Sequence, residues 1–111
     1  MEEEFAKMLP SELPAWLKRA WNPKTPMTSQ NETMRTATHY DPSLDGMMVY
    51  PTIRMVNGKL TKMNDEEARE RAMKAKDYIL LPGVKDYKQG ARFSQSLSRE
   101  AARRRSLFNN R

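Results

Sequence analysis

Short strand-forming segments separated by turn signals are the feature that most constrains the fold of this chain. Three such segments follow one another: residues 34–40, 47–56 and 59–63. The sequence DPSLDG separates the first two, and Asn57-Gly58 separates the last two. Asn-Gly favours a type I′ turn, because both central residues of that turn need positive φ. This order predicts a small antiparallel β-hairpin or meander.

A helix is expected directly after the third segment. Asn64 and Glu67 have the spacing of a capping box, in which the first side chain accepts a hydrogen bond from the backbone three residues later. Small or apolar residues then recur on one helical face: Ala68, Ala72, Ala75 and Ile79. The sequence LLPG at residues 80–83 ends this helix. We therefore expect an α+β core module over residues 33–84, in which one helix packs on the sheet.

One face of the second segment is the better candidate for the core. Met47, Val49, Ile53 and Met55 alternate along this face, as side chains do along a strand. Pro51 has no N–H group to donate to a sheet, so it marks an edge, a bulge or a kink in the expected strand. Methionine carries much of the apolar role, with nine residues in a chain of 111. We expect this face to lie under the helix.

Twelve residues of the central module form an ordered pattern. They are Thr33, Thr36, Gly46, Val49, Pro51, Thr52, Ile53, Gly58, Leu60, Glu66, Glu67 and Ala68. In order, the pattern is a Thr-containing strand, DG-x-x-V-x-PTI, NGKL and DEEA. It resembles a small module of tailed-bacteriophage virion proteins, found alone or attached to large internal proteins and cell-wall hydrolases. The resemblance covers about residues 33–98 and implies a role in the virion without assigned catalytic residues.

An amphipathic helix with two tryptophans is expected within residues 1–32. Ser11 is its candidate N-cap, and Asn22-Pro23 ends it. Its apolar residues share one face by their spacing: Leu13, Trp16, Leu17, Ala20 and Trp21. This face packs on the protein's own sheet, or it anchors the chain in a groove of a partner, where tryptophan is enriched. We take the second alternative, with Leu13, Trp16, Leu17 and Trp21 as partner-binding residues on an extended arm.

The excess positive charge lies in the last quarter of the chain. Residues 85–111 hold eight basic and two acidic side chains, and this excess of six equals the net charge of the whole chain. We expect a basic helix over about residues 86–105 with a weak apolar stripe, either docked on another surface or partly frayed. One interpretation is that this segment contacts phosphates or an acidic protein surface, because guanidinium groups match planar anions. The alternative is a solvated, disordered tail. The expected residues for binding a polyanion or an acidic protein surface are Arg99, Arg103, Arg104, Arg105 and Arg111.

Catalytic chemistry is not expected from this sequence. It has no cysteine and one histidine, His39, with Asp41 nearby but no nucleophile motif. Walker, dinucleotide and zinc-ligand spacings are missing, and helix capping explains the acidic cluster at residues 65–70. We therefore expect no enzyme activity, no cofactor and no metal site. No segment is long and apolar enough for a membrane span.

These patterns together predict a non-enzymatic, minor structural protein of a tailed-phage virion. Its expected partners are larger virion proteins of the portal, neck or tail, or internal ejection proteins, with several copies in each particle. The C-terminal arginines could also contact packaged DNA. The alternative is a small basic nucleic-acid-binding or host-interaction protein, which the net charge of +6 supports.

Overall fold

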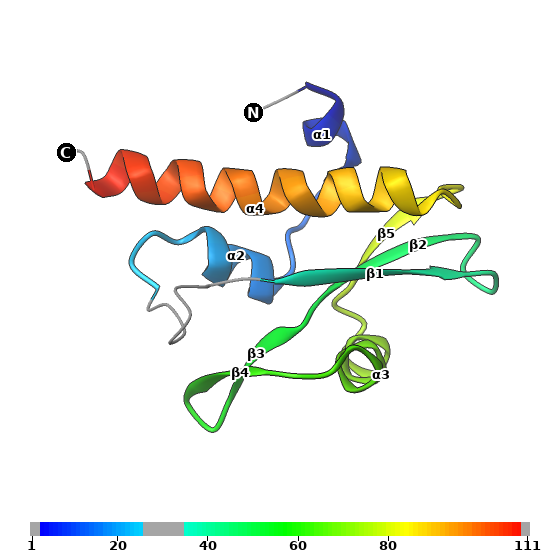
Figure 1. The fold of residues 1–111 in the computed structure, drawn as a ribbon, viewed down its shortest axis with the longest axis horizontal. Coiled ribbons are helices and arrows are strands. Elements are labelled where there is room, and N and C mark those ends of the chain that lie inside the picture. The colour runs from blue at the N-terminus through cyan, green and yellow to red at the C-terminus, as the bar shows by residue number, and fades with distance from the viewer. Residues whose placement is uncertain (1–2, 26–34, 110–111) are drawn as a thin grey trace.

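The computed structural model describes residues 3–25 and 35–109. The elements in chain order are α1 (Glu3–Met8), α2 (Ala15–Trp21), β1 (Thr36–Asp41), β2 (Gly46–Pro51), β3 (Ile53–Val56), β4 (Lys59–Lys62), α3 (Asp65–Ala75), β5 (Ile79–Pro82) and α4 (Tyr87–Asn109). The fold is α+β, as the sequence predicts. Antiparallel sheets of short strands pack against helices, with a short helix at the N-terminus and a long one at the C-terminus (Figure 1).

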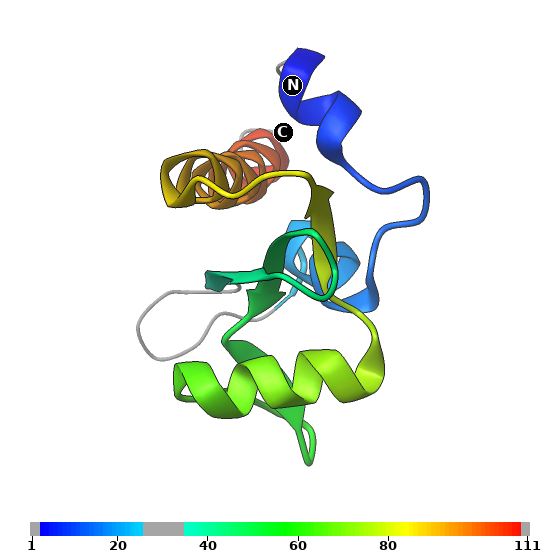
Figure 2. The same cartoon turned by 90° about the vertical axis from the view of Figure 1, so that its right-hand side faces the viewer.

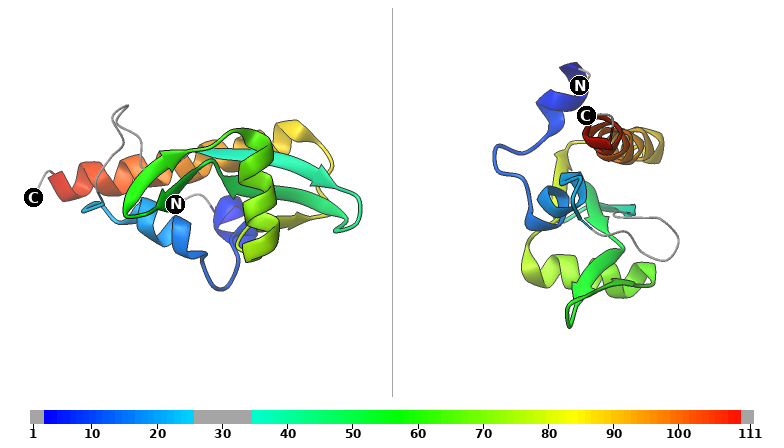
Figure 3. Two further views of the ribbon diagram at one scale, coloured as in Figure 1. Left: turned by 90° about the horizontal axis from the view of Figure 1, so that it is seen from below. Right: turned by 90° about the vertical axis from the view of Figure 1, so that its left-hand side faces the viewer.

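The expected second strand is divided at Thr52 between two sheets. β2 lies in a three-stranded sheet of order β1-β2-β5, whereas β3 and β4 form a separate two-stranded sheet. Thr52 joins them, because its N–H donates to the carbonyl of Arg35 and its carbonyl accepts from the N–H of Met63. Pro51 precedes it and has no N–H group to continue the first ladder. The two hairpins therefore point to opposite ends of the molecule (Figure 3).

The local turn and cap signals are confirmed. Asn57 and Gly58 have φ values of 50° and 80°, which are the positive angles that a type I′ turn requires. The side chain of Asn64 accepts a hydrogen bond of 2.8 Å from the N–H of Glu67 at the start of α3. Both signals act within four residues, so they do not depend on the rest of the fold.

The prediction that Ile79 belongs to a helix is wrong. α3 ends at Ala75, and Lys76 takes a left-handed conformation with φ 53°. Residues 79–82 instead form β5, which pairs antiparallel with β2 and places Leu81 opposite Met47 and Ile79 opposite Val49. This apolar run is thus an outer strand of the sheet. Its partner strand, β2, is far away in the sequence.

β2 is buried on both faces, so the expectation of a single core face is corrected. Met47 and Val49 lie in a core cluster with α1, α2, α4 and β5, while Met48 and Tyr50 lie in a second cluster with α3. Figure 2 shows the strands between α4 on one side and α3 on the other. Ile53 is buried as expected, but Met55 in β3 is 46% exposed.

Helix α4 lies close against the three-stranded sheet. A Cβ atom at Gly90 would lie 3.1 Å from a side-chain carbon of Met47 and 3.3 Å from one of Thr38, so the absence of a side chain allows the close approach. Phe93 and Leu97, one and two turns further along, are buried. Helix α4 is therefore an integral layer of the fold. Of the two expectations for this helix, docked or partly frayed, the docked one is confirmed, on the protein's own sheet.

The N-terminal helices also belong to the main core. Trp16, Leu17 and Trp21 are buried, in one cluster with residues of β2, β5 and α4. The extended arm expected for residues 1–32 is therefore corrected for residues 3–25, since apolar surface on so short a helix needs cover. The part of that arm at residues 26–32 lies outside the described residues. Within the described part of the chain, no helix is long and apolar enough to cross a membrane.

Candidate binding surface on the C-terminal helix

The predicted anchor residues of α2 hold the protein's own elements together. The indole Nε1 of Trp16 donates a hydrogen bond of 2.6 Å to the carbonyl of Asp77, and that of Trp21 donates one of 3.1 Å to the carbonyl of Leu97. Leu13 is half-buried against the same core cluster. The assignment of these side chains to a partner groove is corrected, because their apolar surface is covered within the chain. These side chains pack on the protein's own sheet, which is the other alternative that the sequence left open.

No side chain caps the start of α2. Pro14 occupies the N-cap position, and its side chain makes no capping hydrogen bond. The expectation that Ser11 caps this helix is therefore wrong. The pyrrolidine ring fixes φ near the value that a helix start needs, which favours an entry at this point.

Two of the predicted anion-binding arginines have structural roles. The guanidinium of Arg104 lies 4.4 Å from the centre of the Trp21 ring, and its Nε donates to Glu100 at 2.8 Å. Arg105 donates to the main-chain carbonyl of Thr25 at 2.9 Å. Arg104 thus ties α4 to α2, and Arg105 ties it to the segment that follows α2. Arg111 lies outside the described residues.

Glu100 is the buried centre of the charges at this end of α4. Its carboxylate accepts hydrogen bonds from Arg103 at 2.6 and 2.8 Å and from Arg104 at 2.8 Å. The hydrogen bond from Arg103 contributes most to lowering the pKa of Glu100, to about 2, against the opposing effect of burial. Glu100 therefore stays ionised and holds both guanidinium groups in place.

Four exposed basic residues form a stripe along the outer side of α4. We call Lys88, Arg92, Arg99 and Arg103 the basic stripe; all four are exposed. Their spacing of i, i+4, i+11 and i+15 places them on one helix face, and Gln95 occupies the i+7 position. At 1.5 Å per residue, the stripe is about 22 Å long. Arg99 and Arg103 were predicted from the sequence, whereas Lys88 and Arg92 were missed.

Most of the charge on the basic stripe is not neutralised within the described part of the chain. Arg103 pairs with Glu100, but no ion pair joins Lys88, Arg92 or Arg99 to a carboxylate among residues 3–25 and 35–109. These three cations lie on a continuous helix whose opposite face is held by Phe93 and Leu97. The surface therefore presents positive charges in a fixed geometry, which suits an extended anionic partner.

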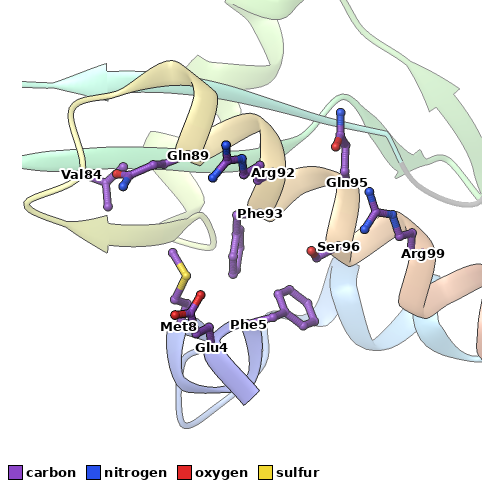
Figure 4. Close-up of a pocket in the computed structure, with 10 residues that line it drawn as sticks. All are labelled: Glu4, Phe5, Met8, Val84, Gln89, Arg92, Phe93, Gln95, Ser96 and Arg99. Atoms are coloured by element: carbon purple, nitrogen blue, oxygen red, sulfur yellow. The ribbon is translucent and has the colours of Figure 1, made fainter. Parts of the chain in front are cut away.

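A groove of about 550 Å³ lies beside the basic stripe, between α1 and α4. Figure 4 shows Phe93 pointing from α4 toward α1, with Phe5 and Met8 on the α1 side. Arg92 and Arg99 line the α4 side of the groove, and Glu4 lies on the α1 side. The groove thus combines an apolar interior with cations along one margin.

In the part of the chain that the structure describes, the remaining titratable groups do not form a recognisable catalytic arrangement. Asp41 accepts hydrogen bonds from the N–H and the hydroxyl of Ser43 at 2.8 and 2.6 Å, which lower the pKa of its carboxyl. His39 Nδ1 lies 3.4 Å from Nη1 of Arg69 on α3. Residues 3–25 and 35–109 contain no group of three His, Cys, Asp or Glu side chains that could hold a metal ion.

No protein-family model, curated protein or solved structure matches this chain. The resemblance to the phage module therefore rests on its motif residues alone. Several of these have clear local roles, since Gly58 forms a turn, Thr52 joins two sheets and Ala68 packs against the sheet. Thr33 lies outside the described residues.

Proposed function

We propose that this chain is a non-enzymatic structural protein that binds an acidic surface of a larger protein through the basic stripe. The observation that carries the proposal is the set of three exposed cations, Lys88, Arg92 and Arg99, without carboxylate partners in the described part of the chain. Because the helix is already docked on the sheet, binding a partner orders only side chains, which reduces the entropic cost. Charge complementarity of this kind steers association and fixes orientation.

A protein partner is favoured over nucleic acid by the apolar groups near the stripe. Leu107 lies one turn beyond Arg103 and is 58% exposed. The groove beside Arg92 and Arg99 is lined by Phe5, Met8 and Phe93. Phosphate backbones gain little from such groups, whereas protein interfaces combine an apolar centre with arginine. We therefore propose an acidic protein surface, with DNA as the second candidate.

The setting that we propose is the particle of a tailed bacteriophage. It is supported by the twelve motif residues of the central module. In this setting the chain is a minor virion component, present in several copies, that binds larger proteins of the portal, neck or tail or the internal ejection proteins. It would reach the virion by assembly with these partners.

Carbodiimide cross-linking of purified particles tests this proposal. This reagent joins an amine directly to a neighbouring carboxylate, so it reports acidic partners of lysine. We expect mass spectrometry to detect the chain in the particles and to find Lys88 joined to Asp or Glu residues of a larger virion protein. Lys74 is the matched control, since it is exposed on α3 on the opposite side of the sheet. Absence of the chain from particles would refute the virion setting.

The DNA candidate predicts a different result. Affinity of the purified chain for duplex DNA would fall steeply with salt, by a log–log slope of about −0.9 for each phosphate contact. Loss of that affinity in a variant with Lys88, Arg92 and Arg99 replaced by Gln, together with no cross-link from Lys88 to protein, would favour this candidate.

A further inference from the structure

The first helix packs on the core through Phe5. Phe5 is the buried residue of the six-residue α1. Its ring lies 5.3 Å from the ring of Phe93 and 6.5 Å from that of Trp21, measured between centroids. The last residue of α1, Met8, is 37% exposed and lines the groove. The groove lies between α1 and α4, with Phe5 and Met8 on one side and Phe93 on the other (Figure 4).

The two sides of the groove differ in charge. Arg92 and Arg99 line the α4 side and are seven residues apart, which separates them by about 10.5 Å along the helix axis. Two carboxylates at positions i and i+7 of another helix have the same separation. Glu4 on the α1 side disfavours a segment that is acidic all round. The charges therefore fit a helix with one acidic face that runs alongside α4.

The interior of the groove fits a bulky apolar side chain. Phe93 forms its base, with Met8 and Val84 beside it. Methionine adapts to differently shaped apolar partners. A volume of about 550 Å³ lies in the range of sites that accept ligands in proteins. An apolar anchor flanked by charges is the usual arrangement when an amphipathic helix binds in a groove.

We propose that the α1–α4 groove binds an acidic amphipathic helix of the partner protein. One bulky apolar residue of that helix enters between Met8 and Phe93. Two of its carboxylates, at positions i and i+7, contact Arg92 and Arg99. This inference rests on the proposed function, because it names the part of the acidic partner that the basic stripe recognises. It goes beyond the proposed function in one respect: the partner also places an apolar side chain in the groove, which binding to the basic stripe does not need.

Two synthetic peptides test the inference. The first is an acetylated helical peptide of about 15 residues, a length at which isolated helices begin to form. It has Glu along one face and Leu and Phe along the other. The second is its polar twin, in which Gln replaces Leu and Phe. We expect fluorescence anisotropy to show that the full chain binds the amphipathic peptide at least about tenfold more tightly, since burial of an apolar side chain contributes more than this.

A groove-filling variant separates the groove from the stripe. Ser96 lines the groove, so Ser96→Trp should reduce the affinity for the amphipathic peptide to that of the polar twin. Ser98→Trp is the matched control, because Ser98 is exposed on the same helix and does not line the groove. Met8→Glu is a second variant, at a half-exposed site. It should lower the affinity for the amphipathic peptide by charge repulsion without disturbing the core.

The outcomes distinguish this inference from the proposed function. Equal binding of the two peptides, or unchanged binding in both Ser96→Trp and Met8→Glu, overturns the groove while leaving the stripe intact. If the basic stripe does not bind acidic partners, the proposed function fails instead. In that case the polar twin does not bind the wild type, and replacing Arg92 and Arg99 by Glu leaves the affinity for the amphipathic peptide unchanged. Tight binding of a DNA duplex that Ser96→Trp abolishes would also overturn the inference.

Discussion

The indole Nε1 of Trp21 donates a hydrogen bond of 3.1 Å to the main-chain carbonyl of Leu97, 76 residues further along the chain. This contact joins the second helix to the last one. The guanidinium of Arg104 covers the same indole ring, 4.4 Å from its centre. Helices α2 and α4, from opposite ends of the sequence, are therefore parts of one core.

Replacing Trp21 should destabilise the isolated protein. Trp21→Ala should lower the free energy of unfolding by about 3–5 kcal/mol, because it removes a buried aromatic side chain from the core. Trp21→Phe keeps most of the apolar surface but loses the hydrogen bond to Leu97, so it should cost about 1 kcal/mol. Urea denaturation followed by circular dichroism measures both. An unchanged midpoint for Trp21→Ala would show that α2 is not part of the core.

Acid should weaken the protein partly through Glu100. The pKa of Glu100 is about 2 in the folded protein, below its ordinary value of 4.5. Its contribution to stability is therefore complete above pH 4.5 and is lost as the pH falls through about 2. Glu100→Gln should cost about 2 kcal/mol at pH 7 through the loss of charged hydrogen bonds, and less as the pH is lowered. A difference between wild type and variant that does not shrink at low pH would contradict this role.

Replacing Gly46 by alanine should destabilise the protein more than replacing Gly58. A Cβ atom at Gly46 would lie 2.6 Å from the carbonyl oxygen of Leu81, so Gly46→Ala must push β5 away from β2. We expect a loss of at least about 2 kcal/mol in the free energy of unfolding. Gly58→Ala is the control, since no atom lies within 4 Å of its Cβ position and only its φ of 80° is unfavourable. That strain costs about 1 kcal/mol, so the reverse order of the two variants would contradict the close approach of β2 and β5.

The three cations of the basic stripe that have no carboxylate partner in the described part of the chain should be dispensable for folding. Replacing Lys88, Arg92 and Arg99 by Gln should change the free energy of unfolding by no more than about 0.5 kcal/mol for each site, because these side chains are exposed. Arg104→Gln should cost more, because Arg104 contacts both Glu100 and Trp21. Thermal unfolding of the four single variants ranks them. Equal effects at Arg92 and Arg104 would remove the distinction between binding and structural arginines.

The parts of the fold that were predicted from the sequence depend on short-range signals. The turn at Asn57-Gly58 and the cap at Asn64 act over four residues or fewer, and the structure confirms both. The strand at residues 79–82 was missed because its paired residues in β2 are 30 to 36 positions away in the sequence, and an apolar run of four does not distinguish strand from helix. Pro51 indicated an edge, a bulge or a kink in the central strand. The division of that strand between two sheets depends in addition on Thr52 pairing with Arg35 and Met63, which are distant from it in sequence.

The candidate site was predicted only in part for a similar reason. Composition located the excess charge near the C-terminus, but not the direction of each arginine. Arg104 and Arg105 point to Trp21 and Thr25, whereas Arg92 and Arg99 face outward. The i, i+4, i+11 spacing from Lys88 would have indicated the stripe, given a helix that continues through Gly90. Glycine lowers helix propensity, and only the packing of α4 on Met47 and Thr38 explains its presence there.

Incorporation of charge-reversed chains into phage particles tests the central claim most directly. The test variant carries Glu at positions 88, 92 and 99, and the control carries Glu in place of Lys18, Lys59 and Lys74, three exposed residues on other elements. Both variants change the net charge by the same amount. We predict that quantitative mass spectrometry of purified particles finds the control at the wild-type level and the test variant at less than about a tenth of it, because like charges at an interface are strongly unfavourable. Equal incorporation of the two variants would contradict the account.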